Sequence, residues 1–257
     1  MTLRHNPIYY LDAISSLVGR ELRIRYKGSL LGLLWAILSP LGTVLILHIL
    51  FSRILPLNIP HYATFLYSAL LPWTWFQSAI ITGAATLIDN RDLVRRPFFP
   101  RPLLPAVVTS TNFLLYLLAF PVLFGLLLVE GVALSPVMLL LPLVWMVQLI
   151  FTLACTIFVA ALGVVVRDVQ HLLSVVMLLW FYLTPIFYDI DRVTPEQARW
   201  LRLNPLAILV QAHRALVLHG RMPDWPALGM LAVAGMLLLG VSLMLFRRLE
   251  DLFVEEV

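Results

Sequence analysis

The sequence has little of the charge that a water-soluble domain needs. Of its 257 residues 12% are charged, whereas soluble domains carry about 25% charged residues. Hydrophobic residues make up 61% of the chain, and the mean hydropathy is +0.94. This composition excludes an ordinary soluble domain and predicts an integral membrane protein. The net charge of +4 is then explained by contact with an anionic leaflet, and no nucleic-acid partner is expected.

Cysteine and lysine are each present only once. Cys155 stands in an apolar run, so it cannot form an intramolecular disulfide and is expected to be a small buried residue. Lys27 is followed by Gly28 in RYKGS, and no glycine-rich loop ends in Gly-Lys-Ser/Thr, so the chain has no Walker A motif. If ATP drives the protein, ATP and Mg must bind a partner ATPase, and we expect no cofactor in this chain.

Ionisable residues are equally scarce within the apolar segments. His48 is the only one away from their ends, and a single histidine favours a polar contact inside the bundle over a proton relay. Asp189 and Asp191 form no obvious metal cluster, and the sequence contains no HExxH motif. We therefore predict no catalytic or metal site. A membrane-embedded enzyme acting on lipid-linked sugars stays a distant alternative, because residues far apart in sequence can converge in space.

Most of the chain consists of long apolar segments. Roughly 20 apolar residues cross a bilayer, and a helix satisfies its own backbone there. The predicted transmembrane helices are 30–51, 62–88, 103–129, 134–166, 172–188 and 228–246. The fourth is longer than a span requires, so we expect it to be tilted or kinked at Pro142. The predicted fold is an all-α integral membrane protein with one transmembrane domain over residues 1–257.

The distribution of basic residues predicts the orientation. With six spans, twelve of the eighteen lysines and arginines fall on the side that holds both termini, which the positive-inside rule places in the cytoplasm. Residues 205–218 are apolar for only 14 positions and include Gln211, His213 and Arg214. This length favours a re-entrant or interfacial helix. Counting it as a full span would instead put the C-terminus outside.

Residues 10–27 are predicted to form an amphipathic helix on the inner membrane surface. Apolar side chains share one broad face at helical spacing, and basic side chains gather opposite. Glu21 and Arg25 are one turn apart and are expected to pair. The helix is interpreted as a membrane anchor, and a role in docking a protein or binding a lipid headgroup is compatible with that interpretation.

Residues 89–105, DNRDLVRRPFFPRPLLP, place charge and proline between two spans. Asp89 is a good N-cap, Asp92 suits the first turn of a helix, and Pro97 should end the helix near Arg96. Asp92 and Arg96 are also expected to pair across one turn. The pattern predicts a short, stiff helix over 89–96. An ordinary positive-inside loop would explain the arginines alone.

Aromatic residues gather at the start of the second span and at the end of the fifth. A belt at the membrane interface explains Trp73, Trp75 and Tyr188, whereas Trp180 and Tyr182 lie deeper than a belt predicts. Aromatic rings suit stacking on sugars, so a lining for a glycan path is a hypothesis with helix packing as its alternative. The candidate path residues are Trp35, Trp75, Phe76, Trp180, Tyr182, Phe187 and Tyr188.

Six stretches in order resemble the membrane subunit of ABC exporters that move lipid-linked polysaccharides such as O-antigen, capsule or teichoic acid. They are RYKGSLLGLLWAILSPL (25–41), LLPWTWFQ (70–77), LVRRPFFPRPLLP (93–105), VVVRDVQHLL (164–173), LTPIFYD (183–189) and LNPLAILVQAHRALVLHG (203–220). The resemblance implies a transport subunit without catalytic residues, in the bacterial cytoplasmic membrane. An ABC permease that exports a drug or a simpler lipid is the nearest alternative.

The resemblance also implies partners and residue roles. It implies a homodimer with the path at its interface, two copies of a cytoplasmic ATPase, and a polyprenyl-pyrophosphate-linked glycan as substrate. The segment 89–96 becomes a coupling helix that docks on the ATPase, and 191–226 becomes an outer gate. The coupling candidates are Asp89, Asp92, Leu93, Arg95 and Arg96. The candidates that attract the pyrophosphate are Arg20, Arg23, Arg25 and Lys27, because guanidinium groups bind phosphate oxygens well.

Overall fold

The structure is a computed structural model that describes residues 7–97, 99–166 and 168–249. Helices are the only regular elements within these ranges, as the sequence predicts. The helices are α1 (Pro7–Arg25), α2 (Trp35–Ile49), α3 (Tyr62–Asp89), α4 (Arg91–Val94), α5 (Leu103–Val129), α6 (Leu141–Val165), α7 (Val169–Leu183), α8 (Pro195–Leu201), α9 (Pro205–Val217) and α10 (Trp225–Leu249). The outermost residues at both termini, predicted to be cytoplasmic, lie outside the described ranges.

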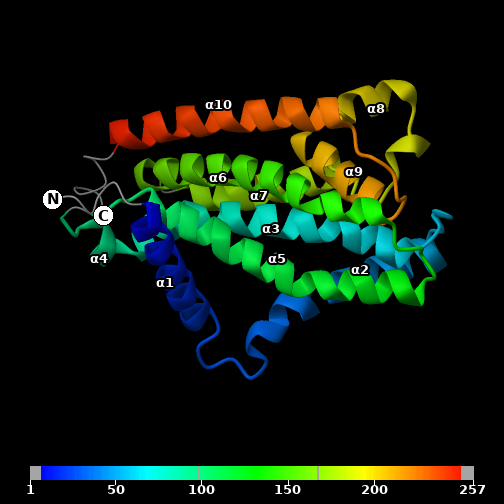
Figure 1. Cartoon of the computed structure of the whole chain (residues 1–257), viewed down its shortest axis with the longest axis horizontal. Coiled ribbons are helices and arrows are strands. Elements are labelled where there is room, and N and C mark those ends of the chain that lie inside the picture. The colour runs from blue at the N-terminus through cyan, green and yellow to red at the C-terminus, as the bar shows by residue number, and fades with distance from the viewer. Residues whose placement is uncertain (1–6, 98, 167, 250–257) are drawn as a thin grey trace.

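The long helices run side by side along the longest axis of the molecule (Figure 1). α3 lies at the centre and contacts α2, α5, α6, α7 and α9. α4, the start of α1 and the end of α10 lie together at one end, which we call the α4 end. α8 and α9 lie at the opposite end, which we call the α9 end. α1 packs against α5 and crosses the long axis steeply.

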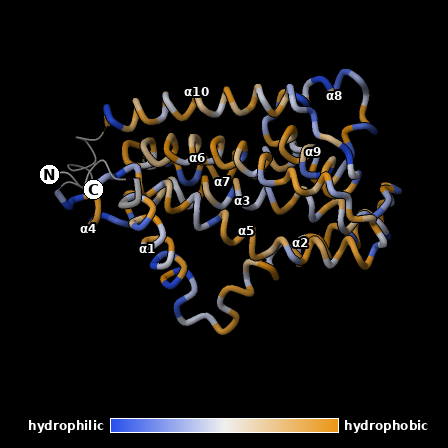
Figure 2. Tube along the Cα trace, viewed as in Figure 1, coloured by the Kyte–Doolittle hydropathy of each residue, from blue (hydrophilic) through white to orange (hydrophobic). Residues whose placement is uncertain are grey.

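Four helical segments of the described chain are long and apolar enough to cross a membrane: Gly32–Ile54, Leu103–Val129, Pro136–Val165 and Trp225–Leu249. Hydrophobic residues predominate along the long helices and hydrophilic residues collect at the two ends (Figure 2). α3 has 28 residues but is less apolar, and it buries most of its side chains inside the bundle. α7 is apolar but has only 15 residues. The chain is therefore a multi-pass membrane protein.

Of the two explanations expected for the length of 134–166, a tilt or a kink at Pro142, the kink does not fit the helix bounds. Residues Pro136–Leu140 form a short 3-10 turn, and α6 begins only after it. Pro142 stands in the first turn of α6, where the missing proline N–H breaks no helical hydrogen bond. The excess length of 134–166 is thus a separate turn in front of a helix of 25 residues.

The predicted helix 172–188 is displaced toward the N-terminus. α7 ends at Leu183, and Thr184 is extended with φ −99° and ψ 134°. Pro185 follows, and the residue before a proline disfavours helical backbone. The predicted helix over 30–51 also differs, since Gly32–Leu34 forms a 3-10 turn before α2 and Leu50–Ile54 forms a wider π turn after it.

The close packing of α3 on α6 depends on glycine. A Cβ placed on Gly163 would lie only 2.2 Å from the carbonyl oxygen of Ala84. A Cβ on Gly83 would lie 2.4 Å from Cγ2 of Thr156. Small residues let helix backbones approach closely in a membrane, where van der Waals contact drives association. This contact joins the two helices near the α4 end.

Candidate functional site

The predicted coupling segment is shorter than its sequence suggested. α3 continues to Asp89, and α4 has only the four residues Arg91–Val94. The prediction that Asp89 is an N-cap is therefore wrong. Asn90 separates the two helices, and its side-chain amide donates to the carbonyl of Thr86 at 3.0 Å. Asp92 and Arg96 form no ion pair in the described chain, because the helix ends before a full turn separates them.

α4 is nevertheless held firmly against the bundle. Leu93 is 9% exposed and Val94 is fully buried, and both belong to an apolar cluster with residues of α3, α5, α6 and α10. The Nε of Arg101 donates to the carbonyl of Val94 at 3.1 Å, which ties α4 to the chain that leads into α5. A force applied to α4 would therefore reach four long helices.

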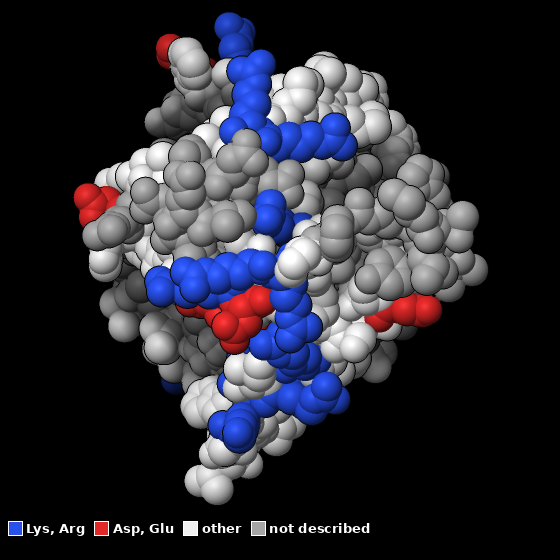
Figure 3. Space-filling view, turned by 90° about the vertical axis from the view of Figure 1, so that its left-hand side faces the viewer, with Lys and Arg blue, Asp and Glu red and all other residues white. Residues whose placement is uncertain are grey.

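A band of charged residues crosses the outer surface of the α4 end (Figure 3). Figure 3 shows lysine and arginine side chains in a band across this face, with few acidic groups. The coupling candidates Asp89, Asp92, Arg95 and Arg96 are exposed. The other exposed basic residues on the helices that meet at this end are Arg20, Arg23, Arg91, Arg247 and Arg248. The face thus presents mostly positive charge to whatever lies beyond the membrane.

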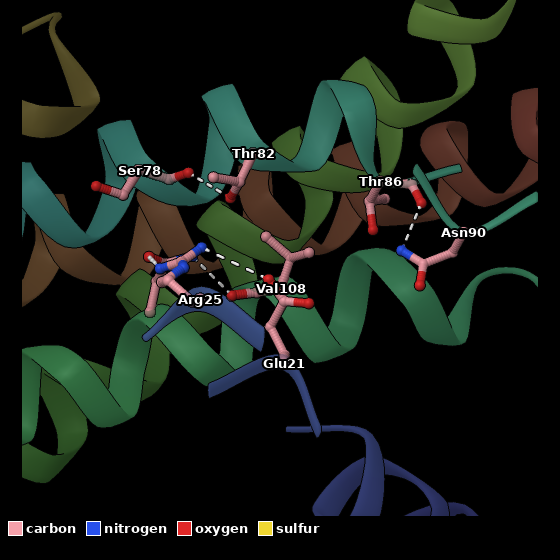
Figure 4. A network of polar contacts seen from close by, with 8 residues as sticks. Glu21, Arg25, Ser78, Thr82, Thr86, Asn90 and Val108 are labelled. Carbon is pink, nitrogen blue, oxygen red and sulfur yellow. Dashed lines mark hydrogen bonds and ion pairs between the residues drawn. The ribbon is translucent and has the colours of Figure 1, made fainter. Parts of the chain in front are cut away.

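Of the four phosphate candidates on or after α1, Arg25 differs from the rest. Arg20, Arg23 and Lys27 are exposed, whereas Arg25 lies on the side of α1 that faces α3 and α5 (Figure 4). Its Nη1 donates to Oδ1 of Asn112 at 3.2 Å. The predicted pairing with Glu21 is confirmed at 3.8 Å. The next residue, Tyr26, has its pKa raised by burial, and the charge of Arg25 opposes this rise.

A cavity of about 380 Å³ lies beside Arg25, between the end of α1, the start of α2, the middle of α3 and α5. Trp35 and Trp75, two of the predicted path aromatics, line it together with Arg25. Trp35 is 51% exposed, while Trp75 is almost completely buried. Phe76 does not line this cavity and packs against Phe151 and Trp180.

The other predicted path aromatics lie toward the α9 end. Tyr182 is 57% exposed. Phe187 stacks on Phe51 with ring centroids 5.6 Å apart and contacts Tyr188 at 5.1 Å. Burial raises the pKa of Tyr188, and the charge of Arg214 opposes this rise. These three residues remain candidates for a path, and they are separate from the cavity.

Trp180 makes a specific contact with α9. Its Nε1 donates to Oδ1 of Asn204 at 2.9 Å. The same oxygen of Asn204 caps α9 by accepting from the N–H of Leu206, and the Nδ2 donates to Thr184 at 3.0 Å. Sequence reasoning missed Asn204, although Asn-Pro at the start of a helix is a capping signal.

Arg214 on α9 was also missed as a functional residue. It is 1% exposed, and its guanidinium donates to the carbonyl oxygens of Pro185 and Ile186, both at 2.6 Å, and of Phe65 at 3.3 Å. Its Cζ lies 3.4 Å from the ring centroid of Phe65, a cation–π geometry. Arg214 thus joins α9 to α3 and to the turn after α7. An ionisable residue in an apolar helix was the available signal.

These features indicate the class of protein to which the chain belongs. A bundle of apolar helices with a charged face at one end, a cavity of mixed polarity between its helices and a short apolar helix at the other end is typical of a transporter membrane domain. Comparison with known families identifies the transporter family. Residues 12–218 match the family of the ABC-2 type transporter, and the chain belongs to that family.

Individual relatives cover nearly the whole chain. It is 36% identical to the O-antigen export system permease protein RfbA of Myxococcus xanthus over 96% of each chain. It is 31% identical to the protein of the same name from Klebsiella pneumoniae, over 99% of this chain and 98% of the relative. The polysialic acid transport protein KpsM of Escherichia coli is 25% identical over 93% of each chain.

Proposed function

We propose that the chain is the permease subunit of an ATP-driven exporter that moves a lipid-linked polysaccharide across the bacterial cytoplasmic membrane. The substrate would be of the O-antigen, capsule or teichoic acid kind. The observation that carries this proposal is end-to-end similarity to permeases named for O-antigen export, at 36% and 31% identity over 96% and 99% of this chain. The absence of a Walker A motif from the sequence supports a separate ATPase that binds ATP and Mg.

In the proposed assembly two copies of this chain bind two copies of the ATPase. The six spans are α2, α3, α5, α6, α7 and α10, with both termini in the cytoplasm. The even number of passes agrees with the start of α1 and the end of α10 lying at the same end of the bundle (Figure 1). The concentration of exposed arginine at that end agrees with a cytoplasmic orientation.

In the proposed mechanism, ATP binding closes the two ATPase subunits and displaces α4. Because Leu93 and Val94 of α4 pack against residues of α3, α5, α6 and α10, the displacement of α4 is passed to these four helices. The dimer interface then rearranges, and the glycan passes outward. This chain supplies the path and the coupling, while bond breaking occurs in the ATPase.

Co-expression with the ATPase of a polysaccharide exporter from the same organism tests the proposal. We expect a stable complex that hydrolyses ATP, and restored surface polysaccharide in cells that lack the native permease. The proposal is overturned if the chain associates with no such ATPase. A complex that hydrolyses ATP but restores no surface polysaccharide would reject the glycan substrate and favour a drug or a simpler lipid.

A further inference from the structure

The cavity is lined by the partly buried side chain of Arg25, which is 23% exposed. Asn112, which holds the guanidinium, stands nine residues after the start of α5 at Leu103, a distance of roughly 14 Å along the helix at the usual rise per residue. Asn112 is 3% exposed, and its Nδ2 is fixed on the carbonyl of Val108 at 2.9 Å. The position of Arg25 is therefore set by a rigid partner and not by the membrane surface.

Arg25 keeps donors for a ligand. A guanidinium has five N–H donors, and in the described chain Arg25 makes one hydrogen bond, to Asn112, and one ion-pair contact, to Glu21. The contact with Glu21 is long at 3.8 Å, and both side chains are partly exposed. A phosphate group could bind the remaining donors in a bidentate way.

Uncharged polar groups line the cavity opposite Arg25. Oε1 of Gln77 accepts from Nε1 of Trp73 at 3.0 Å, which leaves the Gln77 amide nitrogen without a partner within the described chain. The hydroxyls of Ser39 on α2 and Ser78 on α3 also lack a partner there. Hydroxyl and amide groups of this kind bind the hydroxyls of a small ligand by hydrogen bonds.

Aromatic rings form another part of the cavity lining. Trp35, Trp73, Trp75 and Phe181 line the cavity. Trp35 is 51% exposed and offers a flat apolar face, whereas Trp73 and Trp75 are almost completely buried and pack against other rings. Rings beside amide and hydroxyl groups suit a sugar, which has both an apolar face and polar edges. A bare phospholipid headgroup would use the arginine but would leave these rings without a matching surface.

The lining also excludes other ligands. Among the described lining residues none is Asp, Glu, His or Cys, so the usual ligands of a metal ion are missing. Arg25 is the only charged residue among these described lining residues, which favours a ligand with negative charge. The volume of about 380 Å³ is that of a small-molecule site, within the usual range of about 300–1,000 Å³. It has room for a short piece of a polymer only.

We propose that this cavity binds the phosphate and the first sugar of the lipid-linked glycan. Arg25 binds the phosphate, and the side chains of Ser39, Gln77 and Ser78 bind the sugar against the exposed ring of Trp35. The inference rests on the proposed function and adds a selectivity site to it. It also separates Arg25 from Arg20, Arg23 and Lys27, which would attract anionic lipids at the surface without selecting among them.

Binding to the full chain in lipid nanodiscs tests the proposal, with quenching of tryptophan fluorescence as the readout. The probes are farnesyl pyrophosphate and the same lipid carrying N-acetylglucosamine or galactose. We expect at least one sugar-bearing probe to bind 10-fold or more tightly than farnesyl pyrophosphate. Phosphatidylglycerol in place of phosphatidylcholine should change this affinity less than two-fold. Equal binding of all three probes, or displacement by phosphatidylglycerol, would overturn the sugar site.

Matched variants locate the site. Arg25→Gln should weaken binding of every probe 10-fold or more, whereas Arg23→Gln, which removes an exposed charge from the same helix, should weaken it less than two-fold. Gln77→Leu should remove the advantage of the sugar-bearing probe and leave farnesyl pyrophosphate binding unchanged. Equal losses in the two arginine variants would show surface attraction and reject the cavity. A thermal unfolding midpoint like that of the unchanged chain confirms that each variant is folded.

Export measured on the same variants separates this inference from the proposed function. If the unchanged chain with its ATPase restores surface polysaccharide but no probe prefers the cavity, the inference fails and the function stands. If the complex forms with no ATPase, the function fails whatever the probes do.

Discussion

At the α9 end, buried hydrogen bonds tie separate segments of the chain together, whereas at the α4 end apolar side chains pack beneath a layer of exposed charge. Arg214 and Asn204 make the first kind of connection. Leu93 and Val94 make the second. Buried polar groups tolerate little displacement, because each lost partner is costly in a medium of low dielectric constant. The α9 end is therefore held by directional hydrogen bonds, whereas the α4 end is held by apolar packing under an accessible surface.

Removal of the Arg214 side chain should have the largest effect on stability. In Arg214→Leu the carbonyls of Phe65, Pro185 and Ile186 lose a charged donor. A buried group left without its partner costs about 1–3 kcal/mol, so we expect the free energy of unfolding to fall by about 3 kcal/mol. Thermal unfolding of the purified protein in detergent measures this. Arg221→Leu removes an exposed arginine of the same segment and should leave the midpoint nearly unchanged. Equal midpoints for the two variants would show that the carbonyls find other partners.

Asn204 tests the same end with a smaller expected effect. Asn204→Ala removes the cap of α9 and the acceptor of Trp180, and we expect a loss of about 2 kcal/mol in unfolding free energy. Asn204→Asp keeps an acceptor for Leu206 and Trp180 but loses the donor to Thr184. It should therefore recover part of the loss in the same unfolding measurement. If the aspartate variant is no more stable than the alanine variant, the capping oxygen does not matter.

Gly163 tests the helix contact near the α4 end. In Gly163→Ala the added methyl group would meet the backbone oxygen of Ala84 and push α3 away from α6. Overpacking of this kind costs about 1–3 kcal/mol, and we expect the unfolding midpoint to fall accordingly. Gly125→Ala on α5 is the control, because nothing lies within 4 Å of its added Cβ. That change should be neutral or slightly stabilising, since alanine favours helix over glycine. Similar midpoints in both variants would contradict the close contact.

Periodic features of the fold could be predicted from the sequence, whereas contacts between segments could not. The apolar runs predicted α5 at its observed bounds and α3 within one residue, because length and hydropathy determine which segments enter a membrane. The end of α7 was missed because Pro185 acts on the residue before it, within a run that is still apolar. A kink at Pro142, which was expected as an alternative to a tilt, does not fit because a proline in the first turn breaks no helical hydrogen bond.

The candidate site, like the fold, could be predicted from the sequence only in part. From the sequence, Arg20, Arg23, Arg25 and Lys27 were all predicted to attract the pyrophosphate, because they lie close together along the chain. Only the packing of α1 on α5 shows that Arg25 faces a cavity and that Asn112 holds it. The partners of Arg214 lie 28 to 149 positions away along the chain. A buried arginine in an apolar helix indicated importance, but its three carbonyl partners depend on tertiary structure.

The exposed charges of α4 should have the smallest effect on stability and a large effect on transport. Arg95→Glu with Arg96→Glu changes exposed side chains, so the free energy of unfolding should change by less than about 1 kcal/mol. In the proposed assembly these arginines face the ATPase, and the double variant should either release the ATPase or let it hydrolyse ATP without export. Arg247→Glu with Arg248→Glu makes the same change of charge at the same end, on α10. That variant should export normally, because its charges are not on the helix that docks on the ATPase in the proposed assembly. Normal export by the α4 variant would leave Leu93 and Val94 as packing residues alone, and the α4 end would then differ from the α9 end only in its solvation.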